Sequence, residues 1–430
     1  MTGSVAAGAP VEVPAPSLAE ATRVFLRIGL LSFGGPAAQI ALMHRELVED
    51  RNWLSEKQYL SALSFCMLLP GPEAMQLATY AGWKLHGTKG GLVAGLLFVL
   101  PGATIVLALS AAYAAYGSLP LMQALFLGVQ ATVVVIVIEA LLRVARHALK
   151  RREHWIIAGL AFLAIFALHI PFPAIIVAAG LYGYVTSPGA NTTPPPMAPA
   201  RTLQTLTTWL ALWLVPLAAL WVFEGGILTE IGWFFSKLAV VTFGGAYAVL
   251  AYMTQEVVQQ FGWLTMDQMV DGLGLAETTP GPLILVTEFV GYLAAYRTGG
   301  HGLGLAAALV TLWMTFTPCF LWVFVGAPYL DWIASRPRLT GALAAITASV
   351  VGVILNLSLW FALHVFFATV TDWSAGPLQL PLPQLASLQP VAAVLGLLSA
   401  WLILRRHWGL PPVLGLSAAL AVAASLGGVL

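Results

Sequence analysis

Long apolar runs constrain the fold of this chain more than any other feature of its sequence. They lie at 90–116, 119–142, 154–170, 173–186, 205–223, 302–326, 339–368, 388–404 and 411–428. A helix that crosses a bilayer needs about 20 mostly apolar residues. Because 59% of the residues are hydrophobic and only 9% are charged, this apolar surface has to face lipid. We therefore predict an all-α polytopic membrane protein.

Charge and cysteine usage exclude several classes of function. The net charge of +1 gives no reason to expect a nucleic-acid partner. Cys66 and Cys319 lie in separate apolar runs without a neighbouring Cys or His, so we expect neither a metal site nor a disulfide framework. The sequence has no Walker A loop and no dinucleotide-binding fingerprint. We expect no cofactor and no enzymatic activity, so any transport would depend on an ion gradient or on the substrate's own gradient.

The chain contains an internal repeat with an offset of 210 residues. Phe33-Gly34-Gly35 corresponds to Phe243-Gly244-Gly245, and Pro70-Gly71-Pro72 corresponds to Pro280-Gly281-Pro282. Further matches in the same register are Phe25/Phe235, Arg27/Lys237, Glu46/Glu256, Trp53-Leu54/Trp263-Leu264 and Gln58/Gln268. Chance leucine matches are common in membrane proteins, but these motifs in one register indicate a duplication.

The repeat predicts how the chain is divided. We expect a disordered N-terminal tail at 1–17, a first transporter repeat at 18–186, a Pro-rich linker at 187–204, and a connecting helix with a second repeat at 205–430.

The basic residues predict that the two repeats are inverted. Lys and Arg in short loops mark the cytoplasmic side of a membrane protein. They gather at 84–89 and 143–154 in the first half, and at 336–338 and 405–407 in the second. Relative to the first half, the basic loops of the second half are shifted by one span. One unpaired helix between the halves, at 205–223, would cause this shift and invert the second repeat. Arg297, in a loop predicted to lie outside, is an exception.

The FGG and PGP motifs predict breaks in the transmembrane helices. Glycine and proline are costly inside a helix, and each proline also removes a hydrogen-bond donor. A helix that restarts within the membrane presents free N–H groups and a positive dipole end, and both attract an anion. We expect four such ends to converge on a tetrahedral oxyanion, although single kinks also serve packing alone. The predicted binding residues in these motifs are Gly34, Gly35, Pro36, Gly71, Pro72, Gly244, Gly245, Gly281 and Pro282.

Several charged residues lie near these motifs. Arg27 and Lys237 occupy equivalent positions two turns before FGG, where each could neutralise the anion or extend to an interface. Glu73, Glu277 and Glu288 lie beside the PGP motifs and are candidates for proton coupling, because a carboxylate would repel an anion. Glu73 could alternatively cap the helix that it begins. By contrast, we interpret the cluster around Glu46 as a solvated helix end.

The motifs SFGGP at Ser32–Pro36, WL at Trp53-Leu54 and PGP at Pro70–Pro72, with their second-half counterparts, resemble the chromate ion transporter family in its long-chain, two-domain form. The resemblance implies chromate efflux across the bacterial inner membrane, chromate resistance, antiparallel halves, and dependence on a proton gradient or the membrane potential. Sulfate is implied as a mimic. The residue Ala246 stands where the first half has Pro36, so the two breaks need not be equally sharp.

Other functions remain open at this stage. The chain could carry another anion such as sulfate or an organic acid, act as a channel, or reduce chromate in the membrane, for which no redox centre is visible. The expected partners are a small inorganic anion and the lipid bilayer, and a homodimer is a further alternative.

Overall fold

The computed structural model describes residues 16–188, 199–243, 246–330, 332, 336–376 and 378–429. Most of the predicted tail, the centre of the predicted linker, Gly244 and Gly245 therefore lie outside the described residues. The helices before the linker are α1 (Leu18–Leu31), α2 (Gly35–His44), α3 (Glu56–Cys66), α4 (Glu73–Tyr116), α5 (Pro120–Ala148), α6 (Arg152–Phe166) and α7 (Phe172–Thr186). A short π-helical turn, η1 (Arg45–Glu49), continues α2.

The elements after the linker follow nearly the same order. They are α8 (Pro199–Phe223), α9 (Ile227–Val241), α10 (Ala246–Gln255), η2 (Glu256–Gln260), α11 (Met266–Thr278), η3 (Leu283–Leu285), α12 (Val286–Gly326), η4 (Ala327–Tyr329), α14 (Pro337–Phe366), β1 (Val370–Ala375), β2 (Leu378–Pro383), η5 (Leu385–Ser387), α15 (Pro390–Ala400), η6 (Trp401–Arg405) and α16 (Leu410–Leu426). The antiparallel hairpin β1–β2 is an addition that the sequence pattern did not predict. The α-helices otherwise make up the fold, in agreement with a polytopic membrane protein.

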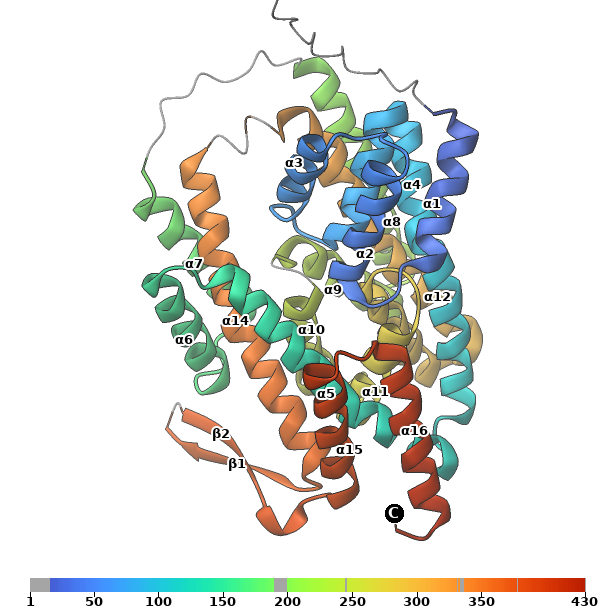
Figure 1. Ribbon diagram of the computed structural model, residues 1–430, viewed down its shortest axis with the longest axis vertical. Coiled ribbons are helices and arrows are strands. Elements are labelled where there is room, and N and C mark those ends of the chain that lie inside the picture. Colours follow the sequence, from blue (N-terminus) through green and yellow to red (C-terminus); the bar gives the residue numbers. More distant parts are fainter. Residues whose placement is uncertain are drawn as a thin grey trace, which may run out of the picture.

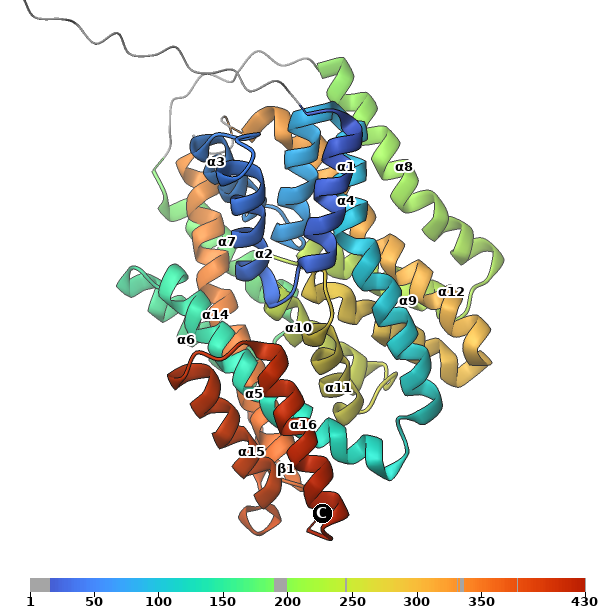
Figure 2. The same ribbon diagram turned by 45° about the vertical axis from the view of Figure 1, so that its right-hand side comes forward.

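Among the residues that the structure describes, five helical segments are long and apolar enough to cross a bilayer. They are Glu73–Tyr116, Pro120–Ala148, Arg201–Phe223, Leu283–Tyr329 and Pro337–Phe366, and three shorter apolar helices accompany them. Only 11% of the most apolar window of α8 is buried in the protein, so this helix presents most of its surface to the surroundings. Figure 2 shows α8 at the outer edge of the bundle.

The two longest helices are each a helical hairpin. In α4 the chain reverses at His86 and Gly87, where Gly87 has a φ of 62°. A Cβ on Gly82 would lie 2.3 Å from the carbonyl oxygen of Gly90, so the arms on either side of the reversal pack in close contact. In α12 the chain reverses in the same way at Gly299 and Gly300. Each helix therefore has a short arm (73–85 or 286–298) and a long arm (88–116 or 301–326).

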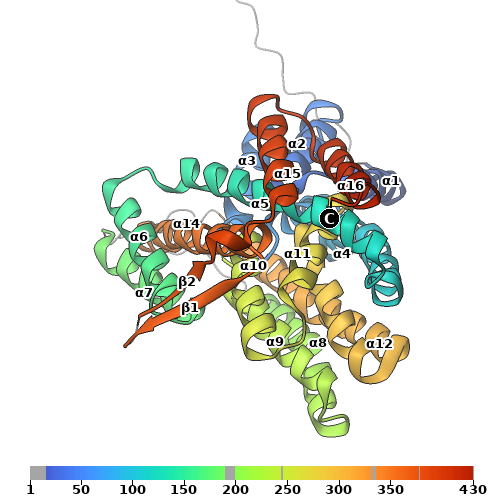
Figure 3. The same cartoon turned by 90° about the horizontal axis from the view of Figure 1, so that it is seen from below.

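The first and second parts of the chain exchange their last helices. Helix α14 packs against α6 and α7 of the first part, and α5 packs against α15 and α16 of the second. The long arms are also central, because α12 packs against both α4 and α9. Figure 1 shows α14 running along the molecule beside α5, with the β1–β2 hairpin at its lower end. Seen from below in Figure 3, α6 and α7 lie on one side, and α8, α9 and α12 on another.

Candidate functional site

The first FGG motif separates two helices that run in different directions. Helix α1 ends at Leu31 and α2 begins at Gly35, and the backbone between them passes through left-handed conformations at Gly34 (φ 83°) and Gly35 (φ 75°). Pro36 lies in the first turn of α2, where its missing N–H has no cost. In the second part, α9 ends at Val241 and α10 begins at Ala246. The intervening Gly244 and Gly245 are outside the described residues.

Each PGP motif lies between a preceding helix and a short arm. Gly71 (φ 123°) follows α3, and Pro72 is the residue before the first turn of α4. Gly281 (φ 93°) follows α11, and Pro282 has the same place before η3 and α12. No side chain caps the backbone amides where helices begin at Gly35, Glu73 and Leu283. The first-turn N–H groups at these three positions are therefore not used by a side-chain cap.

Two equivalent hydrogen bonds join the tips of these motifs across the two parts of the chain. The amide of Gly71 donates to the carbonyl oxygen of Thr242 over 2.8 Å, and the amide of Gly281 donates to that of Ser32 over 2.9 Å. Ser32 and Thr242 immediately precede the two FGG motifs and are themselves 210 residues apart. The PGP motif of each part therefore contacts the residue that precedes the FGG motif of the other. We call these contacting segments, at Gly71 and Thr242 and at Gly281 and Ser32, the tips.

The long arms of α4 and α12 pack closely against the PGP motifs. A Cβ on Gly71 would lie 2.8 Å from the sulfur of Cys319 on the long arm of α12. A Cβ on Gly102, on the long arm of α4, would lie 2.1 Å from the carbonyl oxygen of Pro280. Each PGP motif thus contacts the long arm of the other part.

Two buried glutamines that contact the PGP motifs are not among the residues predicted from the sequence. The side-chain amide of Gln39 donates to the carbonyl oxygens of Gly281 (2.7 Å) and Ser32 (3.2 Å), and so connects both parts of the chain. The amide of Gln76 donates to the carbonyl oxygen of Pro70 over 2.7 Å. In each case the amide oxygen is buried and accepts no hydrogen bond within the described residues. The available signal was their spacing, since each glutamine stands five residues after a motif glycine in an apolar run.

The predicted cations, Arg27 and Lys237, contact carboxylates of their own part. The guanidinium of Arg27 lies 3.5 Å from Glu46, and Lys237 interacts electrostatically with Glu256. These two pairs are equivalent under the 210-residue offset. The expectation that Glu46 lies at a solvated helix end is wrong, because its side chain is only 2% exposed and also pairs with Arg51.

The three candidate proton carriers lie in different surroundings. Glu73 is the first residue of α4 and is partly buried. Glu277, near the end of α11, is buried and accepts a hydrogen bond from the hydroxyl of Tyr247 over 2.7 Å. Glu288, on the short arm of α12, is 1% exposed, and neither carboxylate oxygen has a hydrogen-bond partner within the described residues. A buried carboxylate without a donor is strongly disfavoured in its charged form.

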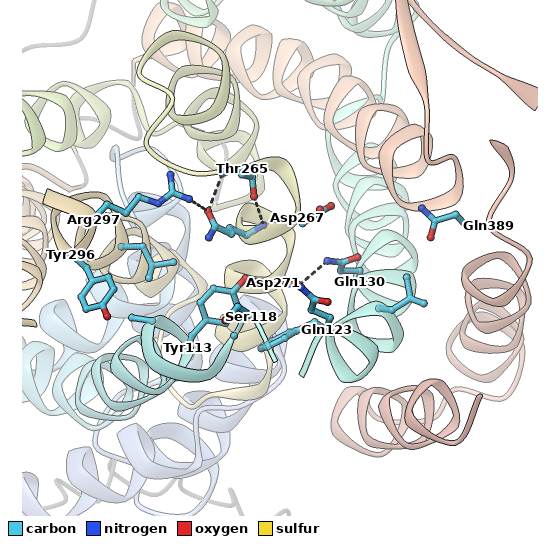
Figure 4. Close-up of a pocket in the computed structure, with 16 residues that line it drawn as sticks. Tyr113, Ser118, Gln123, Gln130, Thr265, Asp267, Asp271, Tyr296, Arg297 and Gln389 are labelled. Atoms are coloured by element: carbon cyan, nitrogen blue, oxygen red, sulfur yellow. Dashed lines mark hydrogen bonds between the residues drawn. The ribbon is translucent and has the colours of Figure 1, made fainter. Parts of the chain in front are cut away.

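A polar cavity of about 660 Å³ opens at the end of the molecule where α4, α5, α11 and the short arm of α12 meet. Figure 4 shows its polar side chains, which include Tyr113, Gln130, Asp271 and Arg297. The buried carboxylate of Asp271 accepts hydrogen bonds from the hydroxyl of Tyr113 (2.6 Å) and the side-chain amide of Gln130 (2.8 Å). Asp271 has no local sequence signal, because its partners come from α4 and α5, more than 140 residues away in the sequence.

Comparisons with known proteins match most of this chain. The family model for chromate transporters matches residues 19–184 and 229–425. A probable chromate transport protein of Synechococcus elongatus is 32% identical over 397 residues, which cover 89% of this chain and 96% of that protein. A chromate transport protein of Cupriavidus metallidurans is 32% identical over 82% of this chain and 84% of its own length.

A chromate transport protein of Pseudomonas aeruginosa is 33% identical over 77% of each chain. No solved structure gives a significant match. The gap between the two matched segments spans the predicted linker and α8. With its FGG and PGP motifs, its long apolar helices and relatives that align along most of its length, this chain belongs to the chromate transporter family.

Proposed function

We propose that this protein exports chromate across the bacterial cytoplasmic membrane and thereby confers chromate resistance. Membership of the chromate transporter family and the similarity to chromate transport proteins support this substrate. The observation that supports the mechanism is the pair of equivalent hydrogen bonds between Gly71 and Thr242 and between Gly281 and Ser32. A site shared by two repeats suits alternating access, because rocking of one repeat against the other exposes it on either side.

The two repeats are inverted in this proposal. The first repeat's α1–α2 and α3–α4 short-arm pairs enter from the cytoplasmic side, where Lys84 and Lys89 flank the reversal in α4. The corresponding pairs of the second repeat enter from the opposite side. Figure 2 is consistent with this, since α1 and α2 lie in the upper part of the molecule and α11 lies in the lower part. The long arms, α5, α8 and α14 span the bilayer.

The tip hydrogen bonds form the gate. Each is worth about 0.5–1.5 kcal/mol net, so breaking both adds only about 1–3 kcal/mol to the free energy needed to separate the tips. When the tips separate, the amides of Gly71 and Gly281 lose their carbonyl acceptors. An oxyanion takes the place of the carbonyl oxygens of Ser32 and Thr242, and two of its oxygens accept these N–H groups. The uncapped first turns after Gly34, Pro72 and Pro282 supply further donors and a positive dipole end.

The side chains around the gate complete the site. Gln39 and Gln76 turn their amide groups toward the anion when the tips separate. The motif residues Gly35, Pro36, Gly244 and Gly245 shape the breaks that expose the N–H groups. Because Arg27 pairs with Glu46 and Lys237 interacts electrostatically with Glu256, neither binds the anion directly. Their positive charges act over a longer range and raise the local concentration of anion. The proton gradient or the membrane potential drives export, and Glu73, Glu277 and Glu288 are the proposed proton carriers.

The test is uptake of radiolabelled chromate into everted vesicles with the pH gradient and the voltage imposed separately. We expect saturable uptake by the wild type and uptake reduced several-fold by Arg27→Gln and Lys237→Gln, with Arg27→Lys retaining most activity. Wild-type uptake by both Gln variants would remove these cations from the mechanism. If unlabelled sulfate competes at the same concentration as chromate, the substrate is a broader class of tetrahedral oxyanion. If the wild type takes up no chromate, the proposed function is wrong.

A further inference from the structure

Buried carboxylates are distributed unequally between the two equivalent helix pairs that carry the PGP motifs. The pair formed by α11 and the short arm of α12 contains Asp271, Glu277 and Glu288, which are 4%, 3% and 1% exposed. At the equivalent positions, 210 residues earlier, the first pair has Ser61, Met67 and Ala78. None of these three is a carboxylate, and the carboxylate beside the first PGP motif, Glu73, is only partly buried. The two pairs are therefore suited to different tasks even though their backbones correspond.

The polar cavity is lined by residues of the second pair and by none of the first. It is lined by Asp267 and Asp271 of α11, Tyr296 and Arg297 of α12, and the loop residues Gly117 and Ser118 that follow α4. The long arm of α4 begins next to Lys89 and ends at Tyr116, so the cavity lies at the end away from that basic cluster. By the positive-inside rule the cavity opens on the non-cytoplasmic side. This is the side from which a proton would move down its gradient into a respiring bacterium.

The charges in the cavity favour a cation over an anion. Asp267 is exposed at the rim, and Asp271 lies behind it on the same helix. The single arginine, Arg297, is held by the carbonyl oxygen of Trp263 (2.7 Å) and the side-chain oxygen of Gln268. An oxyanion entering here would face two carboxylates and a guanidinium whose donors are partly occupied. A proton would be attracted by the same arrangement.

The side chain of Asp271 has hydrogen-bond partners for both its charged and its protonated form. As a carboxylate it accepts hydrogen bonds from Tyr113 and Gln130, which come from the other part of the chain. When Oδ2 is protonated, the Tyr113 hydroxyl can rotate from donor to acceptor while Gln130 continues to donate to Oδ1. The other ionisable groups near it are Asp267 on its own helix and Arg297 on α12, and the sequence of α16 contains none.

We propose that Asp271 is a proton-binding site at the base of this cavity, and that it is the point at which the coupling proton enters the α11–α12 pair. This inference rests on the proposed anion transport and assigns its coupling ion. A proton from cavity water binds Oδ2 of Asp271 and is released toward Glu277, six residues and about 9 Å further along α11. Glu277 is close to the PGP tip, three residues before Pro280. Proton entry and the anion gate are therefore linked through one short helix.

Proteoliposomes containing the full chain test this proposal with two assays. In the first, radiolabelled chromate exchanges with unlabelled chromate at equal pH on both sides. In the second, an imposed pH gradient drives net chromate uptake. For Asp271→Asn we expect exchange within about twofold of wild type and gradient-driven uptake reduced at least tenfold. The control Glu230→Gln removes an exposed carboxylate at the start of α9 and should leave both assays unchanged.

A second variant, Tyr113→Phe, removes a donor to the charged carboxylate while leaving Asp271 in place. We expect it to shift the pH profile of gradient-driven uptake to higher pH, which loss of packing alone would not do. Normal gradient-driven uptake by Asp271→Asn, or loss of both assays in that variant with the protein folded, would overturn the proposal. If wild-type exchange occurs but no pH gradient drives uptake, the proton site is wrong and anion transport stands. If wild-type protein exchanges no chromate, the proposed function itself fails, and this inference with it.

Discussion

The backbone amide of Gly281 donates a hydrogen bond to the carbonyl oxygen of Ser32 over 2.9 Å, although the two residues are 249 positions apart. The bond between Gly71 and Thr242 repeats this contact with the two parts of the chain exchanged. A contact that occurs twice at equivalent positions is determined by the duplicated sequence rather than by one local packing accident. It joins the two parts of the chain at two equivalent points in this conformation.

Gly71 should not tolerate a side chain. Its φ of 123° strains any other residue, and a Cβ would lie 2.7 Å from Nε2 of Gln76 and 2.8 Å from the sulfur of Cys319. We expect Gly71→Ala to reduce chromate uptake at least tenfold and to destabilise the fold by about 1–3 kcal/mol. Gly159→Ala, on α6 with no atom within 4 Å of the added Cβ, is the matched control and should retain uptake. Equal uptake by both variants would show that the tip tolerates distortion.

Gln39 should be more important for transport than its small contribution to stability suggests. Replacement by Leu removes donors to the carbonyl oxygens of Gly281 and Ser32, at a cost of about 1–3 kcal/mol. We expect Gln39→Leu to fold and to lose most chromate uptake, measured in proteoliposomes with the amount of protein matched. Gln260→Leu, at an exposed position at the end of η2, should have uptake close to wild type. Full activity of Gln39→Leu would exclude this amide from the site.

Arg51 should stabilise the fold through Glu46. The Glu46 carboxylate is buried between Arg51 and the 61% exposed Arg27, so Arg51→Met leaves it with only the more solvated partner. We expect a loss of about 1–3 kcal/mol, visible as a lower melting temperature in detergent. In contrast, Arg151→Met breaks an exposed pair with Glu153 and should cost less than about 1 kcal/mol. Equal melting temperatures for the two variants would contradict this account of Glu46.

His44 gives the stability a dependence on pH. At the end of α2, the two ring nitrogens of His44 lie 2.7 Å from a carboxylate oxygen of Glu56 and 3.0 Å from one of Glu49, and the protonated ring donates a hydrogen bond to each. The hydrogen bond with Glu56 is the main reason that the pKa of His44 is raised above 6.5, since partial desolvation acts in the opposite direction. The raised pKa means that the protonated ring contributes stability below about pH 6.5, and this contribution is lost as the pH rises through the folded-state pKa.

The corresponding measurement is the melting temperature from pH 5.5 to 8.5 for wild type and His44→Gln. We expect the difference between them to be largest at the acidic end and to shrink as the pH increases. A difference that is constant across the series would mean that the two carboxylates do not act on His44 in the folded protein.

The local features of the motifs could be predicted from sequence because they depend on single residues. Glycine and proline act through their own backbone geometry. The local sequence alone therefore predicts that a helix ends near Leu31 and that helices begin after Pro72 and Pro282. The contacts between tips could not be predicted, because a carbonyl group carries no sequence signal. Gln39 and Gln76 were visible as polar residues in apolar runs, but only the folded chain shows which carbonyl groups they reach.

Errors arose where a distant residue changes the surroundings of a charge. The local sequence around Glu46 is strongly charged and indicates solvent, whereas in the structure α1 brings Arg27 against it and buries it. Asp271 was missed for the same reason, since Tyr113 and Gln130 come from other helices. The β1–β2 hairpin was not predicted because Pro381 and Pro383 lie within β2, and prolines are unusual in a strand except at an edge.

The central claim is that the tips joined by Gly71 and Gly281 hold the transported anion. Equilibrium binding of radiolabelled chromate to the purified protein tests it most directly, with Gly71→Ala and Gly159→Ala measured beside the wild type at equal amounts of folded protein. We predict saturable binding by the wild type and Gly159→Ala, and affinity at least tenfold weaker for Gly71→Ala. Equal affinity for chromate in all three proteins would contradict the claim and place the anion elsewhere in the molecule.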